Sequence, residues 1–369
     1  MKAFGIIFSD SYSTDDRHEL IRHRSASALP VACRYRAIDF TLSSFVNADV
    51  QEIYLLTKRY YGTLLDHIGS GKDWDLDRKS GGIKLLTPYS HLNAAAPDMM
   101  SGKLDALRTI IPFIRDAKAD YVILGQGNLL ANLDYNAILK QHVESGADLT
   151  LPYAYMEDPG ERSLTVAFDD EGVLTDVKLG GSGKHDTALN CYVMHKDFLL
   201  AFLAQANLYD WHDLNRNLIV RYMGRVRICG YRHDGYAAIC NNVSQFFRAN
   251  MDMLDEAKRN ELFPVERPVL TRVQDTVPTF YRFGAKVTDS LLADGCDVDG
   301  TVSRSLIFRN VTIEEGAVVE DCILMQDAHI GKGAVLKNVI CDKNVTVSAG
   351  VTLTGSEKYP YVLTKGTEV

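Results

Sequence analysis

This chain of 369 residues has no excess of positive charge, no paired cysteine motif and no long apolar run. With 40 lysines and arginines against 48 aspartates and glutamates, its net charge of −8 argues against a nucleic-acid-binding protein. The seven cysteines are scattered and form no CxxC pair, which argues against both a disulfide framework and a zinc site. The apolar run at residues 4–8 is too short for a secretion signal or a membrane span. We therefore expect a cytoplasmic protein that binds neither nucleic acid nor membranes.

The first ~260 residues alternate short apolar runs with segments of helical period. Buried parallel strands are predicted at Phe4–Phe8, Ile53–Thr57 and Tyr121–Gly125, and helices at residues 103–118, 136–144, 197–205 and 243–258. Such alternation is typical of an α/β domain with a mostly parallel sheet. The length of the chain also favours two domains over one.

A different pattern begins near residue 286 and continues to residue 369. Apolar residues recur at steps of five or six and return to the same phase at every third step: Cys296, Val302, Ile307, Ile313, Val319, Leu324, Ile330, Leu336, Cys341, Val347 and Leu353. A small or β-branched residue stands two positions earlier, from Ser305 to Val351. Stacked triangular coils of a parallel β-helix, each of about 17 residues, produce this phase, whereas a sandwich of short strands does not fix it. Three prolines mark residues 261–285 as a linker between the two domains: Pro264, Pro268 and Pro278.

Four segments resemble motifs of the ADP-glucose pyrophosphorylase, or glucose-1-phosphate adenylyltransferase, family. Residues 35–47 match [YF]RxIDFxLSNxxN nearly in full, and Gly102-x-x-Asp105-Ala106 falls at GTADA. Residues 211–219 resemble HDFGxDLIP, and residues 247–254 resemble WxANxDLL. The resemblance covers almost the whole chain. It implies a Rossmann-like, GT-A-like nucleotidyltransferase domain followed by a left-handed parallel β-helix of hexapeptide repeats.

Catalytic members of that family join glucose 1-phosphate to the AMP part of ATP and release pyrophosphate. This reaction needs a glycine-rich loop for the phosphates, carboxylates that hold magnesium, and a cation for the developing charge. The family's AGGxGTRL loop corresponds here to residues 9–20, a stretch with three aspartates and no glycine. Aspartates at this place repel phosphates.

Four further family positions carry residues that cannot perform the chemistry. Ala26 stands for the lysine of R-x-K-P, Gly127 for the aspartate of LAGDH, Leu179 for the lysine of EKP, and Ile239 for the aspartate of WRDVGT. The resemblance therefore implies a chain with no catalytic residue, no metal ligand and no cofactor. It is similar to the family's non-catalytic, GlgD-type regulatory subunit, which implies a catalytic partner subunit, a heterotetramer and a role in glycogen synthesis.

A cluster of cations near the N-terminus is the best candidate for ligand binding. It comprises Arg22, His23, Arg24, Arg34 and Arg36. Planar guanidinium groups suit bidentate phosphate binding, so Arg24, Arg34 and Arg36 are candidate ligands of a sugar-phosphate effector. The alternative is that they form ordinary ion pairs with Asp15, Asp16 and Glu19. Gly102 and Asp105 are candidate ligand residues of the vestigial substrate cleft.

Two other functions stay open from the sequence. An active sugar nucleotidyltransferase with a divergent loop would need Mg²⁺ and replacement carboxylates, such as Asp10, Asp15 or Asp105. A β-helix acyltransferase or scaffold is the second alternative. Acyltransferases of that architecture use a histidine between coils, and only His329 lies inside the repeat, at a position expected to face outward.

Overall fold

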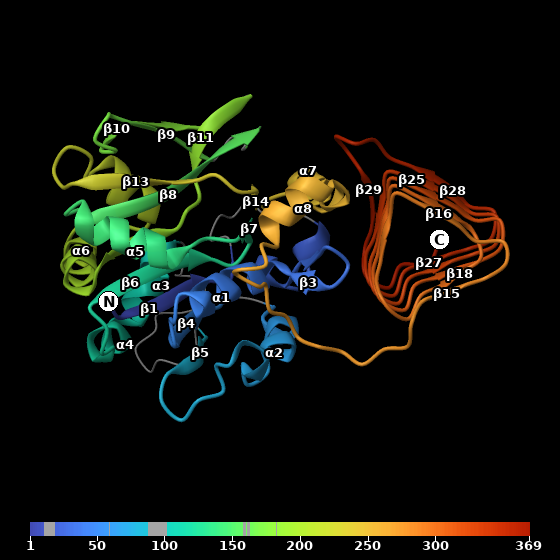
Figure 1. Ribbon diagram of the computed structural model, residues 1–369, viewed down its shortest axis with the longest axis horizontal. Coiled ribbons are helices and arrows are strands. Elements are labelled where there is room, and N and C mark those ends of the chain that lie inside the picture. The colour runs from blue at the N-terminus through green and yellow to red at the C-terminus, as the bar shows by residue number, and fades with distance from the viewer. Residues whose placement is uncertain (11–18, 59, 88–101, 158–159, 161–162, 182) are drawn as a thin grey trace.

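The computed structural model describes residues 1–10, 19–58, 60–87, 102–157, 160, 163–181 and 183–369. It consists of an α/β domain and a triangular β-helix that lie side by side, joined by an extended segment (Figure 1). No helix among these residues is both long and apolar enough to cross a membrane.

The main sheet of the α/β domain is mixed. Its order is β10-β9-β11-β8-β12-β6-β1-β4-β5, with β13 paired to β8. The parallel part comprises β1 (Ala3–Phe8), β4 (Glu52–Leu56), β5 (Gly82–Leu86) and β6 (Tyr121–Gln126), so the three predicted strands are confirmed. The other part, largely antiparallel, comprises β8 (Leu149–Glu157), β9 (Leu164–Phe168), β10 (Leu174–Leu179), β11 (Lys184–Ala188), β12 (Tyr192–His195) and β13 (Ile228–His233).

Two short strand pairs and eight α-helices complete this domain in the described part of the chain. The pairs are β2 (Pro30–Val31) with β3 (Tyr35–Arg36), and β7 (Leu129–Ala131) with β14 (Ala237–Ile239). The helices are α1 (Ala37–Asn47), α2 (Gly62–Ile68), α3 (Lys103–Thr109), α4 (Ile111–Asp116), α5 (Tyr135–Glu144), α6 (Lys196–Leu208), α7 (Val243–Met251) and α8 (Glu256–Leu262).

Two predicted helices are each divided. The predicted helix 103–118 breaks into α3 and α4 at Ile110, because Pro112 lacks the N–H that would continue the first helix. The predicted helix 243–258 breaks before α8, where the Asp255 side chain accepts hydrogen bonds from Ala257 N and Lys258 N and caps a new helix.

The β-helix has three parallel sheets of five strands. The first contains β15 (Phe280–Tyr281), β18 (Asp297–Val298), β21 (Thr312–Ile313), β24 (His329–Ile330) and β27 (Thr346–Val347). The second contains β16 (Lys286–Thr288), β19 (Thr301–Ser303), β22 (Val318–Glu320), β25 (Val335–Lys337) and β28 (Thr352–Thr354). The third contains β17 (Leu291–Leu292), β20 (Leu306–Ile307), β23 (Ile323–Leu324), β26 (Val339–Cys341) and β29 (Tyr361–Leu363). The predicted inward series forms one buried column of side chains.

Two details of the predicted repeat need correction. The strand partner of Ile313 is Val298, not Cys296, so this coil is shorter than the next one, in which Ile313 pairs with Ile330. The regular phase therefore begins only after the short coil. The β-helix also starts before residue 286, because β15 already pairs with β18 inside the predicted linker. Left-handed turns recur at the same corner of successive coils, for example at Arg304, Asp321 and Asn338.

The two domains share an apolar interface. The third sheet of the β-helix contributes Leu306, Ile323 and Ile340, and the α/β domain contributes Phe40, Phe247 and other residues of one continuous buried cluster. Figure 1 shows this sheet, with β29, facing the region of α7, α8 and β3. A contact of this kind fixes the relative position of the domains through apolar burial.

A buried histidine of α5 predicts an acid-sensitive fold. His142 is 3% exposed, its Nδ1 lies 2.8 Å from Thr150 Oγ1, and burial lowers its pKa from 6.5 to about 4. The unfolded chain therefore binds this proton at higher pH than the folded chain does. Stability should fall by up to about 3 kcal/mol as the pH drops from 6.5 to 4.

Urea denaturation at several pH values tests this expectation. His142→Gln should flatten the pH dependence between pH 6.5 and 4, whereas the exposed control His23→Gln should leave it unchanged. An unchanged slope in His142→Gln would show that another group is responsible.

Candidate functional site

The first position expected to hold a metal carboxylate is closed by a neighbouring side chain. Gly127 follows β6, and its N–H donates to Phe8 O at 2.9 Å. A Cβ added to Gly127 would lie 2.0 Å from Ser27 Oγ and 3.1 Å from Phe8 O. Ser27 is held there because its hydroxyl donates to Ser9 O at 2.5 Å. No side chain fits at Gly127 without displacement of Ser27.

The second position lies in an apolar cluster. Ile239 is 4% exposed and ends β14, which pairs with β7. Beside it, Asn128 Nδ2 donates to Cys240 O at 3.2 Å and to Asn241 Oδ1 at 2.9 Å, so neutral amides stand near this position. A magnesium ion is usually bound in proteins through one or two carboxylates, and neither Gly127 nor Ile239 supplies a side-chain oxygen. No group of three or more His, Cys, Asp or Glu suited to a metal occurs in the described part of the chain.

The other two positions that the resemblance implies to be altered lie apart from one another. Ala26 is buried in a short 3-10 turn, and Leu179 is exposed at the end of β10. At the carboxyl ends of β1 and β6, Lys103 Nζ donates to Gln126 Oε1 at 2.7 Å and lies over the Phe8 ring. Sequence reasoning missed this lysine, which stands inside the GTADA-like segment.

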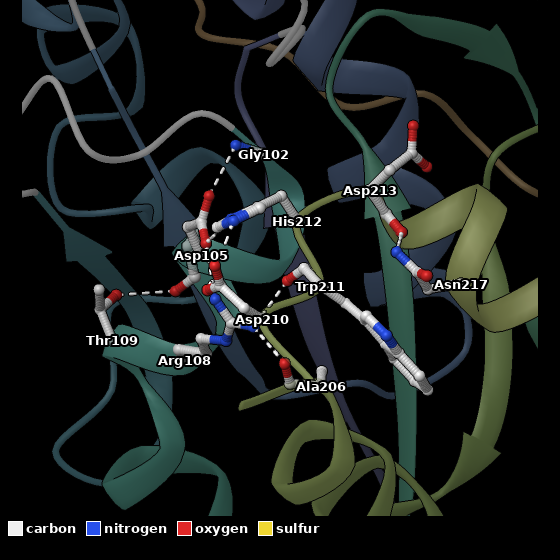
Figure 2. Close-up of polar contacts among 11 residues, drawn as sticks. Gly102, Asp105, Arg108, Thr109, Ala206, Asp210, Trp211, His212, Asp213 and Asn217 are labelled. Carbon is white, nitrogen blue, oxygen red and sulfur yellow. Dashed lines mark hydrogen bonds and ion pairs between the residues drawn. The ribbon is translucent and has the colours of Figure 1, made fainter. Parts of the chain in front are cut away.

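Gly102 and Asp105 form a closed polar cluster with His212 and Arg108 (Figure 2). Asp105 Oδ2 accepts from Gly102 N at 2.9 Å, while Oδ1 accepts from Arg108 Nη1 at 2.9 Å and lies 2.8 Å from His212 Nδ1. A Cβ on Gly102 would lie 2.1 Å from His212 O, so only glycine fits there. The hydrogen bond to Asp105 raises the pKa of the half-exposed His212. Asp105 thus ties the start of α3 to the His212 segment.

The carboxylates that an active enzyme would need are committed elsewhere or lie outside the described residues. Asp10 Oδ2 accepts from Ser9 Oγ at 3.0 Å and from Lys58 N at 3.2 Å. Asp105 is engaged as above, and Asp15 falls in residues 11–18, outside the described part of the chain. His329 is half exposed and its Nε2 lies 3.0 Å from Glu314 Oε1, on the outside of the β-helix as expected.

The three candidate arginines have different surroundings. Arg24 is 4% exposed, and its Nη2 donates to both carboxylate oxygens of Asp342 at 2.6 and 2.8 Å. Arg34 is exposed, and Arg36 is half buried with Nη1 donating to Thr63 O at 2.6 Å. Among the described residues, no ion pair joins Arg34 or Arg36 to a carboxylate. The suggested partners Asp15 and Asp16 lie outside the described residues.

Arg34 and Arg36 line a cationic cleft between the domains. We use this name for the small cavity of about 40 Å³ that is surrounded by five cationic side chains: Arg34, Arg36, Arg272, Arg309 and Lys343. Its remaining lining residues are Pro30, Cys33, Tyr35, His67, Gln274, Phe308 and Gln326, so no carboxylate of the described residues lines it. A larger cavity of about 440 Å³ adjoins it and shares Cys33, Arg34, Tyr35 and Arg309. Five cations without a lining carboxylate form a site suited to a polyanion.

Burial and mutual repulsion weaken the protonated state of these cations. Burial, together with the charges of Arg36 and Arg24, lowers the pKa of Lys343 to about 8, although Asp342 opposes this shift. Burial likewise lowers the pKa of Arg36 to about 10, although Asp39 opposes this shift. The pKa of Arg309 is lowered by burial and by Arg34. Arg309 is 8% exposed, and its Nε finds no hydrogen-bond partner among the described residues. An anion in the cleft would relieve each of these penalties.

Sequence reasoning missed Arg272, Arg309, Lys343 and His67. A signal existed for two of them, since Arg309, Gln326 and Lys343 follow one another at the regular repeat and therefore occupy one column of the β-helix. Lys343 Nζ donates to Gln326 Oε1 at 3.3 Å within that column. Arg272 lies in the linker and is placed by the contact of its guanidinium with Asp66 O. Nothing in the local sequence predicts that position.

The RxIDF segment positions the α/β side of the cleft. Asp39 is fully buried and accepts from Arg36 N at 2.9 Å and from Thr271 Oγ1 at 2.6 Å. The Nε2 atom of His67 lies 2.6 Å from Asp39 Oδ1. One carboxylate thereby joins α1, α2 and the linker at the edge of the cleft.

A domain with the fold of a nucleotidyltransferase, joined to a hexapeptide β-helix, defines the class of protein. Residues 18–174 match the nucleotidyl transferase family, and residues 280–358 match the GlmU-like C-terminal hexapeptide family. The chain belongs to the glucose-1-phosphate adenylyltransferase family and, within it, to the GlgD-type proteins.

Three relatives illustrate this membership. The chain is 32% identical over 366 residues to the glycogen biosynthesis protein GlgD of Geobacillus stearothermophilus, covering 99% of this chain and 97% of the relative. It is 28% identical over 362 residues to the protein of the same name from Bacillus subtilis, covering 98% and 95%. It is 28% identical over 325 residues to the glucose-1-phosphate adenylyltransferase of Fervidobacterium nodosum, covering 86% and 77%.

Proposed function

We propose that this chain is a regulatory subunit of glucose-1-phosphate adenylyltransferase in glycogen biosynthesis and does not itself form ADP-glucose. The observation that carries the proposal is the closed position at Gly127, where Ser27 occupies the space that a metal-binding carboxylate needs. Ile239 adds an apolar side chain at the second metal position. Without both carboxylates, the charge on the reacting phosphates has no magnesium ion to neutralise it.

The proposed partner is the catalytic subunit, in a heterotetramer. Exposed apolar side chains at the first coil of the β-helix support a docking role. Phe280, Tyr281 and Phe283 are 61%, 53% and 111% exposed, and large exposed apolar groups of this kind are typical of interaction sites. All seven cysteines are free and buried, in keeping with a reducing compartment such as the cytoplasm.

The proposed regulatory ligand is a sugar phosphate held in the cationic cleft. The cleft lies where both domains and the linker meet, so an anion there would contact Arg36 of the α/β domain, Arg272 of the linker and Lys343 of the β-helix. Ligand binding would favour one arrangement of the domains over another. A partner subunit packed on the same elements would respond to that change through a coupling free energy.

The alternative of an active enzyme with a divergent loop receives no support from the geometry. It needs Mg²⁺ and replacement carboxylates, yet Asp10 and Asp105 already accept hydrogen bonds that hold backbone segments together. The acyltransferase alternative rests on His329, which is paired with Glu314 on the outer face of the β-helix.

Pyrophosphorylase activity of the purified chain tests the proposal, alone and mixed with the catalytic subunit from the same organism. ATP, glucose 1-phosphate and Mg²⁺ are saturating. We expect no turnover by the chain alone. The mixture should differ from the catalytic subunit in turnover, substrate affinity or response to sugar phosphates. Substantial magnesium-dependent turnover by the chain alone would refute the proposal.

A further inference from the structure

A single acidic residue stands in an otherwise apolar column of the domain interface. Phe308, Met325 and Asp342 occupy the same place in successive coils of the regular repeat. Phe308 and Met325 are buried in the apolar cluster shared by the two domains. Asp342 is 2% exposed at the corresponding place in the next coil. A buried carboxylate there is costly unless a cation meets it.

Arg24 is that cation. Its Nη2 contacts both carboxylate oxygens of Asp342, and its Nη1 lies 3.6 Å from Met325 Sδ. The pair joins the α/β domain to the β-helix across the interface, and both side chains are shielded from solvent. In this arrangement the Arg24 guanidinium is committed to an internal anion.

The pair lies beside the cationic cleft. Asp342 precedes Lys343, whose backbone N–H donates to Asp342 Oδ1 at 2.7 Å. The charge of Arg24 lowers the pKa of both Arg36 and Lys343, so Arg24 is within electrostatic reach of two residues that line the cleft. Arg24 itself is not a lining residue. Asp342 therefore cancels one positive charge that would otherwise act on an anion in the cleft.

We propose that Asp342 is an internal competitor of the regulatory anion, which holds Arg24 in the domain interface and out of the cationic cleft. This inference rests on the proposed binding of a phosphorylated ligand in that cleft. Asp342 weakens anion binding, because it keeps the charge of Arg24 away from the cleft whether or not the anion is bound. The Arg24–Asp342 pair therefore sets the affinity of the cleft for the anion.

Isothermal titration calorimetry with inorganic pyrophosphate as the probe tests the inference on the full chain, at ionic strength held constant with KCl. Arg36→Gln identifies binding in the cleft, because it removes a lining cation. In Asp342→Asn the dissociation constant should fall at least about fivefold, while the melting temperature without ligand also falls. Asp297→Asn is the matched control, since Asp297 pairs with Arg282 on the exposed surface of the β-helix and should leave binding unchanged.

A double variant keeps the test decisive if Asp342→Asn folds poorly. Arg24→Met with Asp342→Leu removes both charges together, so affinity for pyrophosphate should equal that of the wild type. A loss as large as that of Arg36→Gln would overturn the inference, since Arg24 would then contact the anion directly. Unchanged or weaker binding in a folded Asp342→Asn would overturn it as well. Absence of binding in the wild type and in every variant would overturn anion binding in the cleft itself.

Discussion

Replacement of Arg24 by methionine is expected to lower the free energy of unfolding by about 3–5 kcal/mol. The substitution leaves the Asp342 carboxylate buried at 2% exposure without its bidentate partner. A buried charge that loses its partner has neither water nor a cation to stabilise it. Urea denaturation measures the effect, and Arg34→Met is the matched control because Arg34 is exposed. The control should change stability by less than about 0.5 kcal/mol.

The double variant Arg24→Met with Asp342→Leu separates the cost of the unpaired buried charge from the cost of lost packing. Since Phe308 and Met325 already make this column apolar, leucine at 342 extends an existing contact. Replacement of a buried ion pair by apolar side chains of similar size is often neutral or stabilising. We expect the double variant to recover most of the loss. A double variant as unstable as Arg24→Met alone would show that packing, and not the unpaired charge, causes the loss.

Restoration of the two family carboxylates is expected to destabilise the chain without producing activity. Gly127→Asp forces a side chain to within 2.0 Å of Ser27 Oγ, and Ile239→Asp places a carboxylate in an apolar cluster. Each substitution should cost about 3 kcal/mol or more, through overpacking in the first case and desolvation of a charge in the second. Urea denaturation and a pyrophosphorylase assay give the two readouts.

The substitution Ser27→Gly tests directly whether the Ser27 side chain causes the loss of stability at position 127. Combined with Gly127→Ala, it should restore a large share of the stability that Gly127→Ala alone loses, because the clashing hydroxyl is gone. Gly62→Ala is the control, since a Cβ at Gly62 meets nothing within 4 Å. Measurable magnesium-dependent turnover in Gly127→Asp with Ile239→Asp would contradict the argument that the surrounding shell, and not only two residues, excludes the metal.

The sequence by itself was sufficient to predict the β-helix. Inward and outward positions in a coil follow from side-chain identity alone, so the regular phase is visible without knowledge of any distant contact. The same reasoning missed the short coil before Ile313, because Cys296 is apolar and buried although Val298 is the strand partner. The first strand, β15, was also missed, since two exposed aromatic residues carry no inward signal.

The resemblance assigned the two metal positions to Gly127 and Ile239, and neither glycine nor isoleucine has a side-chain atom that can ligate magnesium. The sequence did not predict which side chain occupies the space beside Gly127. Ser27 reaches Gly127 only because β1, β6 and the Ala26–Ala28 turn converge in space. The local pattern likewise did not reveal that Asp105 contacts His212, since His212 lies on a remote segment.

The electrostatic organisation of the domain boundary was decided by the tertiary structure alone. Arg24 and Asp342 are 318 positions apart in the chain, and the cationic cleft combines arginines of the α/β domain, the linker and the β-helix. The sequence determined the two kinds of domain, because these depend on side-chain identity and short-range period. Packing determined which charged groups lie close together. The Coulomb energy between them depends on their distance and burial, and neither quantity follows from the order of the residues in the chain.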